Sequence, residues 1–481
     1  MLKFTAHKRL KSELKTFIKA AGQQWLSTAA AQNPRLSPEL WQLEYVGNEL
    51  AFRGRALSSL LSKWGTPLHI VDEAKLISNL ESFQKVADGF EDGLEVFYSY
   101  KTNPLPWVFE VLHQQGAGAE VISEYELWLA LKLGVPADKI IYNGPAKSQA
   151  SLEAAIDKNI LSININNAEE LDRISALAAA LGKTARVGIR VTSAAGWTGQ
   201  FGLPVETGAA LEVFRQALAQ PELSVTTLHC HRGNLIYDED TLQSHLHFLL
   251  KFVDELKEKL NWIPAVLDVG GSLATPTVRY LSKKEIKLAT TFLVPPSPPE
   301  PQSVLTPQAY AETVVRVVRS HFQQQGYPQP RIVSEPGRSL TGNSQFMLTT
   351  VQNLKHDASF DFAVLDAGIN LASCVASEYH EVFPLQLKSA PMRCHRLVGP
   401  ICHMGDTLYM ASYLPQLERQ DALAIMDSGA YFIADATSFA FSQPAVVAIT
   451  TSGQEVLIRK AESFDHLVSL DHFAAKEGQP S

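Results

Sequence analysis

The sequence predicts an α/β protein in which a parallel (β/α) barrel is joined to a second, β-rich domain. Strand-like and helical segments alternate from about residue 65 to residue 334, as parallel strands with helical crossovers require. From about residue 346 to residue 470 the chain is richer in β-type runs. Its length of 481 residues makes two domains the default expectation.

The composition is that of an ordinary globular protein with enough apolar residues for a large core. Hydrophobic residues make up 46% of the chain, charged residues 19%, and the formal net charge is -8. This charge argues against a nucleic-acid-binding surface, and no apolar run reaches the roughly 18 residues of a membrane helix. The four cysteines form no C-x-x-C pair, so we expect free thiols and a cytoplasmic location.

The chain divides into four expected parts. Residues 1–35 begin with a basic, amphipathic stretch that predicts a helical extension docked on the body or on a partner subunit, with a transit peptide as the alternative. Residues 36–70 hold strands expected to join the β-domain, residues 71–345 form the barrel, and residues 346–481 form the β-domain. The proline-rich run from Pro295 to Pro301 predicts a stiff surface insertion near 280–305.

Individual elements follow from residue type and spacing. The expected barrel strands are short runs of β-branched and aromatic residues over 96–100, 140–142, 162–165, 186–191, 226–229, 266–269 and 331–334. Helical periodicity predicts helices over 168–181 and 242–260. The expected strands of the β-domain cover 362–365, 407–410, 424–427, 445–450 and 455–459, with earlier strands near 43–53.

Lys101 is the most informative single residue. It lies at the C-terminal end of the expected strand 96–100, and Pro104 and a helix from Pro106 follow it. Burying an ammonium group is costly, so a lysine here needs a reason. A Schiff base is one such reason, because an imine is no longer a bare cation. A side chain that snorkels to the rim is the alternative.

Other candidate residues follow the later strands. Glu335-Pro-Gly337-Arg338 comes after the strand 331–334, although Glu-x-x-Arg is also a common surface pair. Asp268-Val-Gly270-Gly271-Ser272 can form a concave nest of backbone N–H groups for phosphate, or a plain tight turn. His229 and His231 share one strand face, but two ligands are too few for a metal site.

Together these motifs resemble those of the fold-type III pyridoxal-phosphate decarboxylases, a family that includes the diaminopimelate, ornithine and biosynthetic arginine decarboxylases. The resemblance runs in family order to about residue 444 and adds Cys402-His403-Met-Gly-Asp406 and Asp427-Ser-Gly-Ala-Tyr431. It implies a (β/α)8 TIM-type barrel that binds pyridoxal 5'-phosphate, plus a C-terminal β-domain as in alanine racemase and ornithine decarboxylase. It also implies an amino-acid decarboxylase that works as a homodimer with shared active sites.

The resemblance assigns a role to each matching residue. Lys101 would hold the cofactor as an imine, His231 would lie over its ring, and Glu335 would hold the proton on its pyridine nitrogen. Cys402 would protonate the product carbanion across the dimer interface, with His403 and Asp406 near the substrate. The phosphate and its surroundings would be bound by Asn234, Gly270, Gly271, Ser272, Gly337, Arg338 and Tyr431. No metal is expected.

Departures from the family pattern concern the substrate. Diaminopimelate decarboxylases carry an Arg-Pro-x-Leu-Tyr element that helps hold the distal carboxylate, but the interval from Asn370 to Tyr379 is shorter here and has no arginine. His403 also replaces a glutamate that reaches the distal amine. These changes predict a substrate other than free meso-diaminopimelate, such as an amino-acid conjugate of siderophore or other secondary metabolism.

Three alternatives stay open. The chain could be a genuine diaminopimelate decarboxylase of lysine biosynthesis or a catalytically inactive regulatory homologue that binds the cofactor. It could also be an amino-acid racemase on the related alanine-racemase fold. The presence of Lys101 and Cys402 argues against an inactive homologue. Glu335 argues against the racemases, which use no glutamate on the pyridine.

Overall fold

The computed structural model describes residues 35–472 apart from 86–92, 194–195, 197–198, 234 and 357–359. The chain forms two compact units. The barrel unit contains Glu73–Pro276 and Glu300–Ser344, and the β-rich unit contains the described residues up to Asp72, Thr277–Pro299 and those from Gln345 on. The predicted amphipathic extension lies, up to residue 34, outside the described residues.

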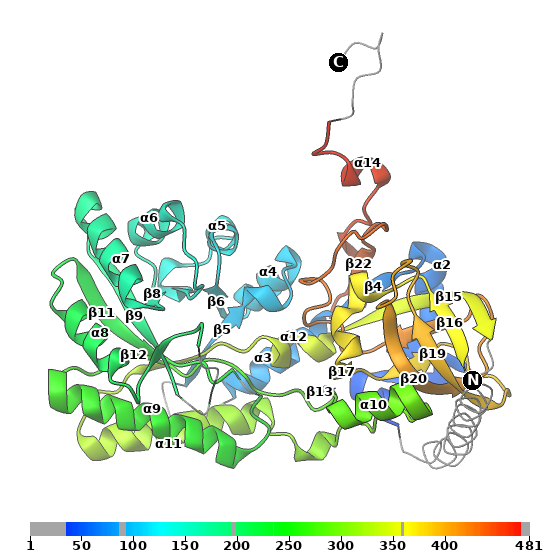
Figure 1. Ribbon diagram of the computed structural model, residues 1–481, viewed down its shortest axis with the longest axis horizontal. Coiled ribbons are helices and arrows are strands. Elements are labelled where there is room, and N and C mark those ends of the chain that lie inside the picture. The colour runs from blue at the N-terminus through cyan, green and yellow to red at the C-terminus, as the bar shows by residue number, and fades with distance from the viewer. Residues whose placement is uncertain are drawn as a thin grey trace, which may run out of the picture. The chain divides into compact units, whose positions relative to one another are not determined.

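Eight parallel strands close into a barrel, which confirms the predicted fold class (Figure 1). Their order is β9-β11-β12-β14-β5-β6-β7-β8, and the pairing of β8 with β9 closes the ring. Buried apolar side chains, Phe97, Ile141 and Val333 among them, form a cluster within this unit. The barrel strands are β5 (Leu94–Ser99), β6 (Gly118–Val121), β7 (Ile140–Tyr142), β8 (Ser162–Ile165), β9 (Ala185–Thr192), β11 (Leu223–His229), β12 (Val266–Asp268) and β14 (Arg331–Ser334).

Helices follow the barrel strands and surround them (Figure 1). Their ends carry the expected capping residues: Asn167 accepts a hydrogen bond from the N–H of Glu170 at the start of α7, and Gly182 ends that helix in the left-handed region. The helices of this unit are α3 (Glu73–Gln84), α4 (Pro106–Gln114), α5 (Glu124–Lys132), α6 (Gln149–Lys158), α7 (Ala168–Leu181), α8 (Ala209–Leu218), α9 (Glu239–Leu260), α11 (Pro307–Gln325) and α12 (Arg338–Thr341). Short pieces are η2 (Tyr100–Thr102), η3 (Ala137–Lys139), β10 (Leu203–Pro204), η4 (Pro301–Ser303) and η5 (Gly342–Ser344).

One barrel strand was absent from the sequence prediction. Strand β6 reads Gly-Ala-Glu-Val and so lacks the bulky residues that mark the other strands. Its glycine is required by space, since a Cβ atom on Gly118 would lie 2.7 Å from the Phe97 ring and 2.9 Å from the Lys139 carbonyl oxygen. Close packing of the barrel wall therefore removed the local signal for this strand.

The β-rich unit is built on a mixed sheet with the order β20-β19-β16-β15-β4-β22-β23, to which β21 and β18 are added through β15. The predicted C-terminal β-domain is confirmed. The strands are β4 (Leu68–Asp72), β15 (Gln345–His356), β16 (Asp361–Leu365), β18 (Val382–Pro384), β19 (Met392–Val398), β20 (Thr407–Pro415), β21 (Ala422–Ile425), β22 (Ala445–Ile449) and β23 (Glu455–Arg459). Short helices are η1 (Pro38–Trp41), α2 (Leu57–Trp64), α13 (Ile369–Ala372), η6 (Ser373–Ala376) and α14 (Phe464–Leu467).

The early strands form a small sheet of their own in this unit. Strands β1 (Leu43–Val46), β2 (Glu49–Phe52) and β3 (Arg55–Ala56) pair antiparallel, and the N–H of Leu50 donates to the carbonyl of Leu385 at 2.8 Å. Leu50 and Phe52 share one apolar core with Leu68 of β4 and Phe346 of β15. The expected link to the β-domain is therefore made mainly through side-chain packing.

The insertion also packs within the β-rich unit. It contains β13 (Arg279–Tyr280) and α10 (Lys283–Phe292), whose capping box joins Ser282 and Glu285. The guanidinium of Arg279 pairs with Glu285 and donates to the carbonyl of Ser297, so both ends of the insertion are tied together. The proline-rich run from Pro295 has no regular secondary structure before η4. Among the described residues, no helix is long and apolar enough to cross a bilayer.

Candidate active site

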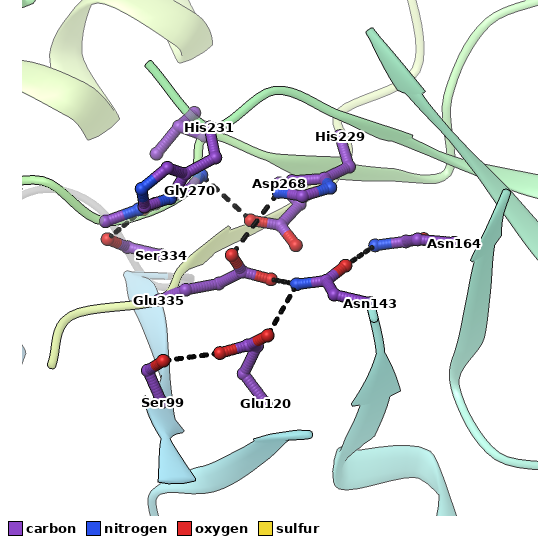
Figure 2. Close-up of polar contacts among 12 residues, drawn as sticks. Ser99, Glu120, Asn143, Asn164, His229, His231, Asp268, Gly270, Ser334 and Glu335 are labelled. Carbon is purple, nitrogen blue, oxygen red and sulfur yellow. Dashed lines mark hydrogen bonds and ion pairs between the residues drawn. The ribbon is translucent and has the colours of Figure 1, made fainter. Parts of the chain in front are cut away.

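A network of buried polar side chains lies at the C-terminal ends of the barrel strands (Figure 2). Asn143, directly after β7, donates to Glu335 Oε1 at 2.6 Å and to Glu120 Oε1 at 2.9 Å. Its own oxygen accepts from Asn164 of β8 at 2.7 Å, and Ser99 at the end of β5 donates to Glu120 Oε2 at 2.5 Å. Residues from five strand ends therefore meet in one place, as in other enzymes built on this barrel.

Glu335 and Asp268 form a coupled pair of carboxyl groups beside His229. The His229 Nε2 atom lies 3.3 Å from Glu335 Oε2. Burial alone would raise the pKa of Glu335, but His229 beside it and the neighbouring Asp268 hold that pKa below its ordinary value. Burial and then the Glu335 carboxylate raise the pKa of Asp268 well above its ordinary value. Glu335 is therefore the ionised member of the pair and Asp268 the protonated one.

Lys101 lies at the same end of the barrel. Strand β5 ends at Ser99, and Lys101 follows in the short turn η2, two residues beyond the strand. Its Nζ atom lies 3.7 Å from Glu120 Oε2, and 41% of the side chain is exposed. The sequence prediction that this lysine ends a buried strand is therefore correct to within two residues. Partial exposure gives the amine access to a carbonyl compound.

Lys147, unlike Lys101, has no exposed amine. Its Nζ atom donates to the carbonyl oxygens of Gly144 at 2.7 Å and Asn164 at 2.9 Å, and to Glu170 Oε1 at 2.8 Å. The side chain is 0% exposed. All three donors of the ammonium group are used, so Lys147 stabilises the barrel and does not present a reactive amine.

A glycine loop follows β12. Gly270 has a φ of 70° and Ser272 a φ of 78°. A Cβ atom on Gly271 would lie 2.3 Å from the Glu335 carbonyl oxygen, so only glycine fits there. The N–H of Gly270 donates to Asp268 Oδ1 at 2.9 Å, so the predicted role of this loop in binding phosphate stays a prediction. Ser272 occupies the position of the family's third glycine, and a left-handed serine costs on the order of 1 kcal/mol.

His231 forms hydrogen bonds with this loop. Its Nδ1 atom accepts a hydrogen bond from the N–H of Gly271, and its Nε2 atom lies 3.2 Å from the hydroxyl of Ser272. An accepting Nδ1 places the proton of the neutral ring on Nε2. Burial and then the charge of Lys101 lower the pKa of His231 well below its ordinary value. The imidazole is therefore neutral. Asn234, three residues later, lies outside the described residues.

Gly337 and Arg338 lie at the start of the short helix α12, and the Arg338 side chain is buried. A Cβ atom on Gly337 would lie 2.1 Å from Thr102 Oγ1, so the loop after β14 touches the turn that carries Lys101. This contact brings the Glu-Pro-Gly-Arg motif and the lysine motif together within the barrel unit.

Cys402, His403, Asp406 and Tyr431 belong to the β-rich unit. Cys402 is exposed on a loop between β19 and β20. The buried Asp406 carboxylate accepts from the N–H groups of Ile369 and Ile401, both at 2.8 Å, so it fixes the loop that carries Cys402. This contact shows how Asp406 supports the loop, and its predicted role toward the substrate stays a prediction.

Tyr431 adopts a left-handed backbone conformation with a φ of 68°. The same short segment contains Asp427, whose φ is 59° and whose Oδ1 accepts from the hydroxyl of Thr277 at 2.7 Å. This hydrogen bond anchors the segment against the chain just before the insertion. The predicted contact of Tyr431 with phosphate stays a prediction.

Comparisons with known proteins identify the family. Residues 73–342 match the model for the pyridoxal-binding domain of the pyridoxal-dependent decarboxylases. The chain belongs to this family. The diaminopimelate decarboxylase of Aquifex aeolicus is 30% identical over 444 residues, which are 89% of this chain and 97% of that protein. The corresponding enzyme of Methanocaldococcus jannaschii is 28% identical over 86% of this chain and 92% of that protein.

Solved structures agree with this assignment. The crystal structure of the M. jannaschii diaminopimelate decarboxylase in complex with L-lysine has a TM-score of 0.80 at 26% identity, covering 90% of this chain and 98% of that one. A crystal structure of an A. aeolicus protein has a TM-score of 0.77 at 29% identity, covering 90% and 99%. The protein is therefore a pyridoxal-phosphate-dependent amino-acid decarboxylase that is similar to diaminopimelate decarboxylases, as the sequence predicted.

The barrel residues fit pyridoxal phosphate. Among the described residues, several buried polar atoms at the strand ends make no hydrogen bond, namely Thr102 Oγ1, both ring nitrogens of His229 and Asp268 Oδ2. An ionised Glu335 suits a protonated ring nitrogen. Lys101, with its partly exposed amine, suits the carbonyl carbon of the cofactor.

Sequence reasoning missed the residues that connect this site. Asn143 and Asn164 bridge the carboxylates, and His229 had been considered only as a metal ligand paired with His231. The ligand atoms of His229, Asp268 and Glu335 lie within 4.8 Å of one another, so His229 belongs with the two carboxyl groups instead. The available signal was position, because each of these polar residues lies at or near the end of a buried strand or directly follows one.

Borohydride reduction should attach the cofactor to Lys101 and leave Lys147 unlabelled. The amine of Lys101 is partly exposed, whereas Lys147 uses all three of its donors inside the barrel. Peptide mass mapping of the reduced holoenzyme measures this directly. The Lys101→Ala variant should lose the visible absorption of the lysine-bound cofactor. A label on the Lys147 peptide, or none on the Lys101 peptide, would contradict the assignment.

Replacing Glu335 by glutamine should lower kcat by about 100- to 1,000-fold, the usual cost of removing a preorganised electrostatic partner. The amide cannot hold the ring proton as a carboxylate does. Cofactor should still be trapped on Lys101, which separates this loss from a loss of binding. Glu95→Gln is the matched control. Glu95 pairs with Arg331 near the N-terminal ends of β5 and β14, at the other end of the barrel from Glu335. Equal activity of the two variants would remove Glu335 from the mechanism.

Proposed function

We propose that this decarboxylase acts as a dimer with shared active sites, on an amino acid whose distal end differs from that of meso-diaminopimelate. The observation that carries this proposal is the segment between β16 and β18. It contains no arginine from Asp366 to Met392, and its buried residues Leu371 and Val375 belong to an apolar core cluster.

The cofactor, when bound, supplies a sink for the electrons left behind by the departing carboxyl group. Lys101 would hold it through its side-chain amine. Glu335 stays ionised through its contacts with His229 and Asp268, and so keeps a proton on the ring nitrogen. His231 is neutral and holds the loop of Gly270 and Gly271 in place for the phosphate.

Cys402 delivers the proton to the carbon that has lost its carboxyl group. The thiol stands on an exposed loop whose backbone is held by the buried Asp406. An exposed thiol on a fixed loop is suited to reach a site formed with a second copy of the chain. A symmetric dimer of this kind contains two equivalent shared sites.

The distal end of the substrate meets different chemistry from that of the family pattern. The first lysine or arginine after Asp366 is Lys388, which is already paired with Asp421 and Glu418. A carboxylate that loses a bidentate arginine in a desolvated site loses about 2–5 kcal/mol, or roughly two to three powers of ten in kcat/KM.

The ring of His403 is suited to bind a hydrogen-bond acceptor on the substrate. Its Nδ1 atom accepts from the N–H of Gly405 at 3.1 Å, so the proton of the neutral ring lies on Nε2. The ring edge is therefore a donor, suited to a carbonyl, hydroxyl or carboxylate oxygen. A glutamate at this position would instead accept from an ammonium group. We propose a neutral or acidic distal group, such as an acyl arm on a diamino acid.

A second candidate is meso-diaminopimelate itself. The curated relatives named above are diaminopimelate decarboxylases, and the chain covers more than nine-tenths of their length. This candidate requires that residues outside the Asp366–Met392 segment hold the distal carboxylate.

Cys402→Ala should slow turnover strongly while the cofactor remains bound on Lys101. The reason is that the variant lacks the acid but keeps the barrel. Cys394→Ala is the matched control, because the Cys394 thiol donates to the carbonyl of Leu293 inside the unit. Full-speed turnover with a clean product in Cys402→Ala would assign protonation to another group.

Mixing two inactive variants tests the shared site in the same experiment. A dimer of Lys101→Ala with Cys402→Ala contains one site with both native residues, so random exchange should restore roughly a quarter of the native activity. If each chain carried a complete site of its own, mixing would restore nothing.

A decarboxylation panel tests the substrate. It should contain meso-diaminopimelate, lysine, ornithine, arginine and carboxylate-bearing conjugates of diamino acids, compared by kcat/KM. We expect a conjugate to exceed meso-diaminopimelate by about 100-fold or more, from the cost of the missing arginine. Robust turnover of meso-diaminopimelate with the others silent would establish the second candidate instead.

A further inference from the structure

A second cluster of reactive side chains lies in the β-rich unit, and no step of the proposed decarboxylation uses it. A sulfur, a carboxylate oxygen and an imidazole nitrogen from Cys374, Glu378 and His380 all lie within 4.8 Å of one another. Glu378 and His380 are buried, and Cys374 is partly buried. We call these three residues the Cys374–Glu378–His380 cluster.

The orientation of His380 leaves one nitrogen for a cation. Its Nδ1 atom lies 2.9 Å from the carbonyl oxygen of Met426. A carbonyl can only accept, so Nδ1 carries a proton. Nε2 faces Glu378 Oε2 at 3.3 Å. In a neutral ring this nitrogen presents a lone pair to a carboxylate oxygen, and two lone pairs repel unless a positive charge lies between them.

Only a proton or a metal ion can supply that charge inside the unit. With a proton, the ring is an imidazolium. A divalent metal would neutralise the carboxylate and a thiolate together. The hydrogen bond from Nδ1 to a backbone carbonyl is the arrangement that orients histidine ligands in metal sites.

The distances and donor types suit zinc. Donors around a tetrahedral Zn²⁺ with the usual bond lengths are separated by about 3.3 to 3.6 Å, and the Nε2 to Oε2 distance is 3.3 Å. A thiolate, an imidazole and a carboxylate are all established zinc ligands. Calcium and magnesium prefer oxygen donors and would not select a thiolate.

A cavity of about 130 Å³ adjoins two of the three residues, Glu378 and His380. Its other walls include Pro295 and Pro296 of the insertion and Leu408 and Tyr409 of β20. A zinc ion with three protein ligands keeps a fourth position for water or a small ligand. The cavity provides room for that fourth position.

We propose that the Cys374–Glu378–His380 cluster binds one zinc ion, with its fourth coordination position open to this cavity. Binding forms bonds from zinc to the thiolate, the carboxylate and Nε2, and releases the protons of the thiol and of the imidazolium to solvent. The ion lies within the β-rich unit, and none of its three ligands is a residue assigned to the cofactor.

The test is a metal titration of the cofactor-loaded protein after treatment with a chelator. We expect about one equivalent of Zn²⁺ to bind, and Co²⁺ in its place to give a thiolate-to-cobalt charge-transfer absorption. Loss of an outer-shell partner already costs about 10–100-fold in metal affinity, so Cys374→Ser should cost at least that much and abolish the absorption. Cys394→Ser is the control and should keep both, since its partly buried thiol lies outside the cluster.

A second readout needs no variant. Zinc should protect Cys374 of the native protein from alkylation, as measured by peptide mass spectrometry, while the exposed Cys402 continues to react. His380→Gln should remove that protection. Equal zinc binding by native protein and Cys374→Ser, or equal alkylation of Cys374 with and without zinc, would overturn the proposal. In that case His380 holds a proton instead of a metal.

Discussion

Three carboxyl groups buried at one end of the barrel constrain the rest of that unit. Glu120, Asp268 and Glu335 lie in one network, and burying charge without partners costs several kcal/mol per group. The structure satisfies these groups with a proton on Asp268, the amide of Asn143 between the other two, and contacts with His229 and Lys101. These contacts require strand ends that are fixed relative to one another, which a closed barrel provides.

The charged residues of the active site could be recognised in the sequence because they follow predicted strands. Lys101 and Glu335 are charged groups that directly follow buried runs, and this conflict between charge and burial is what local pattern can detect. Asn143 gave no such signal, because an amide after a strand is equally typical of a turn. Asn164 lies inside β8, where a single polar residue does not mark a site. Strand β6 was missed for a steric reason, since Gly118 is needed where the Phe97 ring leaves no room for a side chain.

In the β-rich unit, prediction from the sequence is limited by a different factor, the order of the strands. Most of its strands were recognisable as β-type runs, but their order depends on pairings between distant segments. Strand β4, near residue 70, lies between β15 and β22, whose sequence positions are hundreds of residues later. Periodicity identifies which face of a strand is buried and does not name its neighbours. The same holds for β1 to β3, which share a core with that sheet and pair with one another, while Glu49 of β2 also bridges to Gln386.

The insertion and the segment after Asn370 are physically joined. Strand β13 of the insertion pairs with β17 (Glu378–Tyr379) of that segment, with Tyr280 opposite Glu378. Alternate strand residues face the same side, so this pairing fixes Glu378 on the side of His380, while the Tyr379 hydroxyl donates to Glu381 at 2.7 Å. The insertion therefore holds the carboxylate that completes the Cys374–Glu378–His380 cluster, and its prolines wall the adjoining cavity. The insertion and the segment that carries the cluster are therefore coupled through this strand pair.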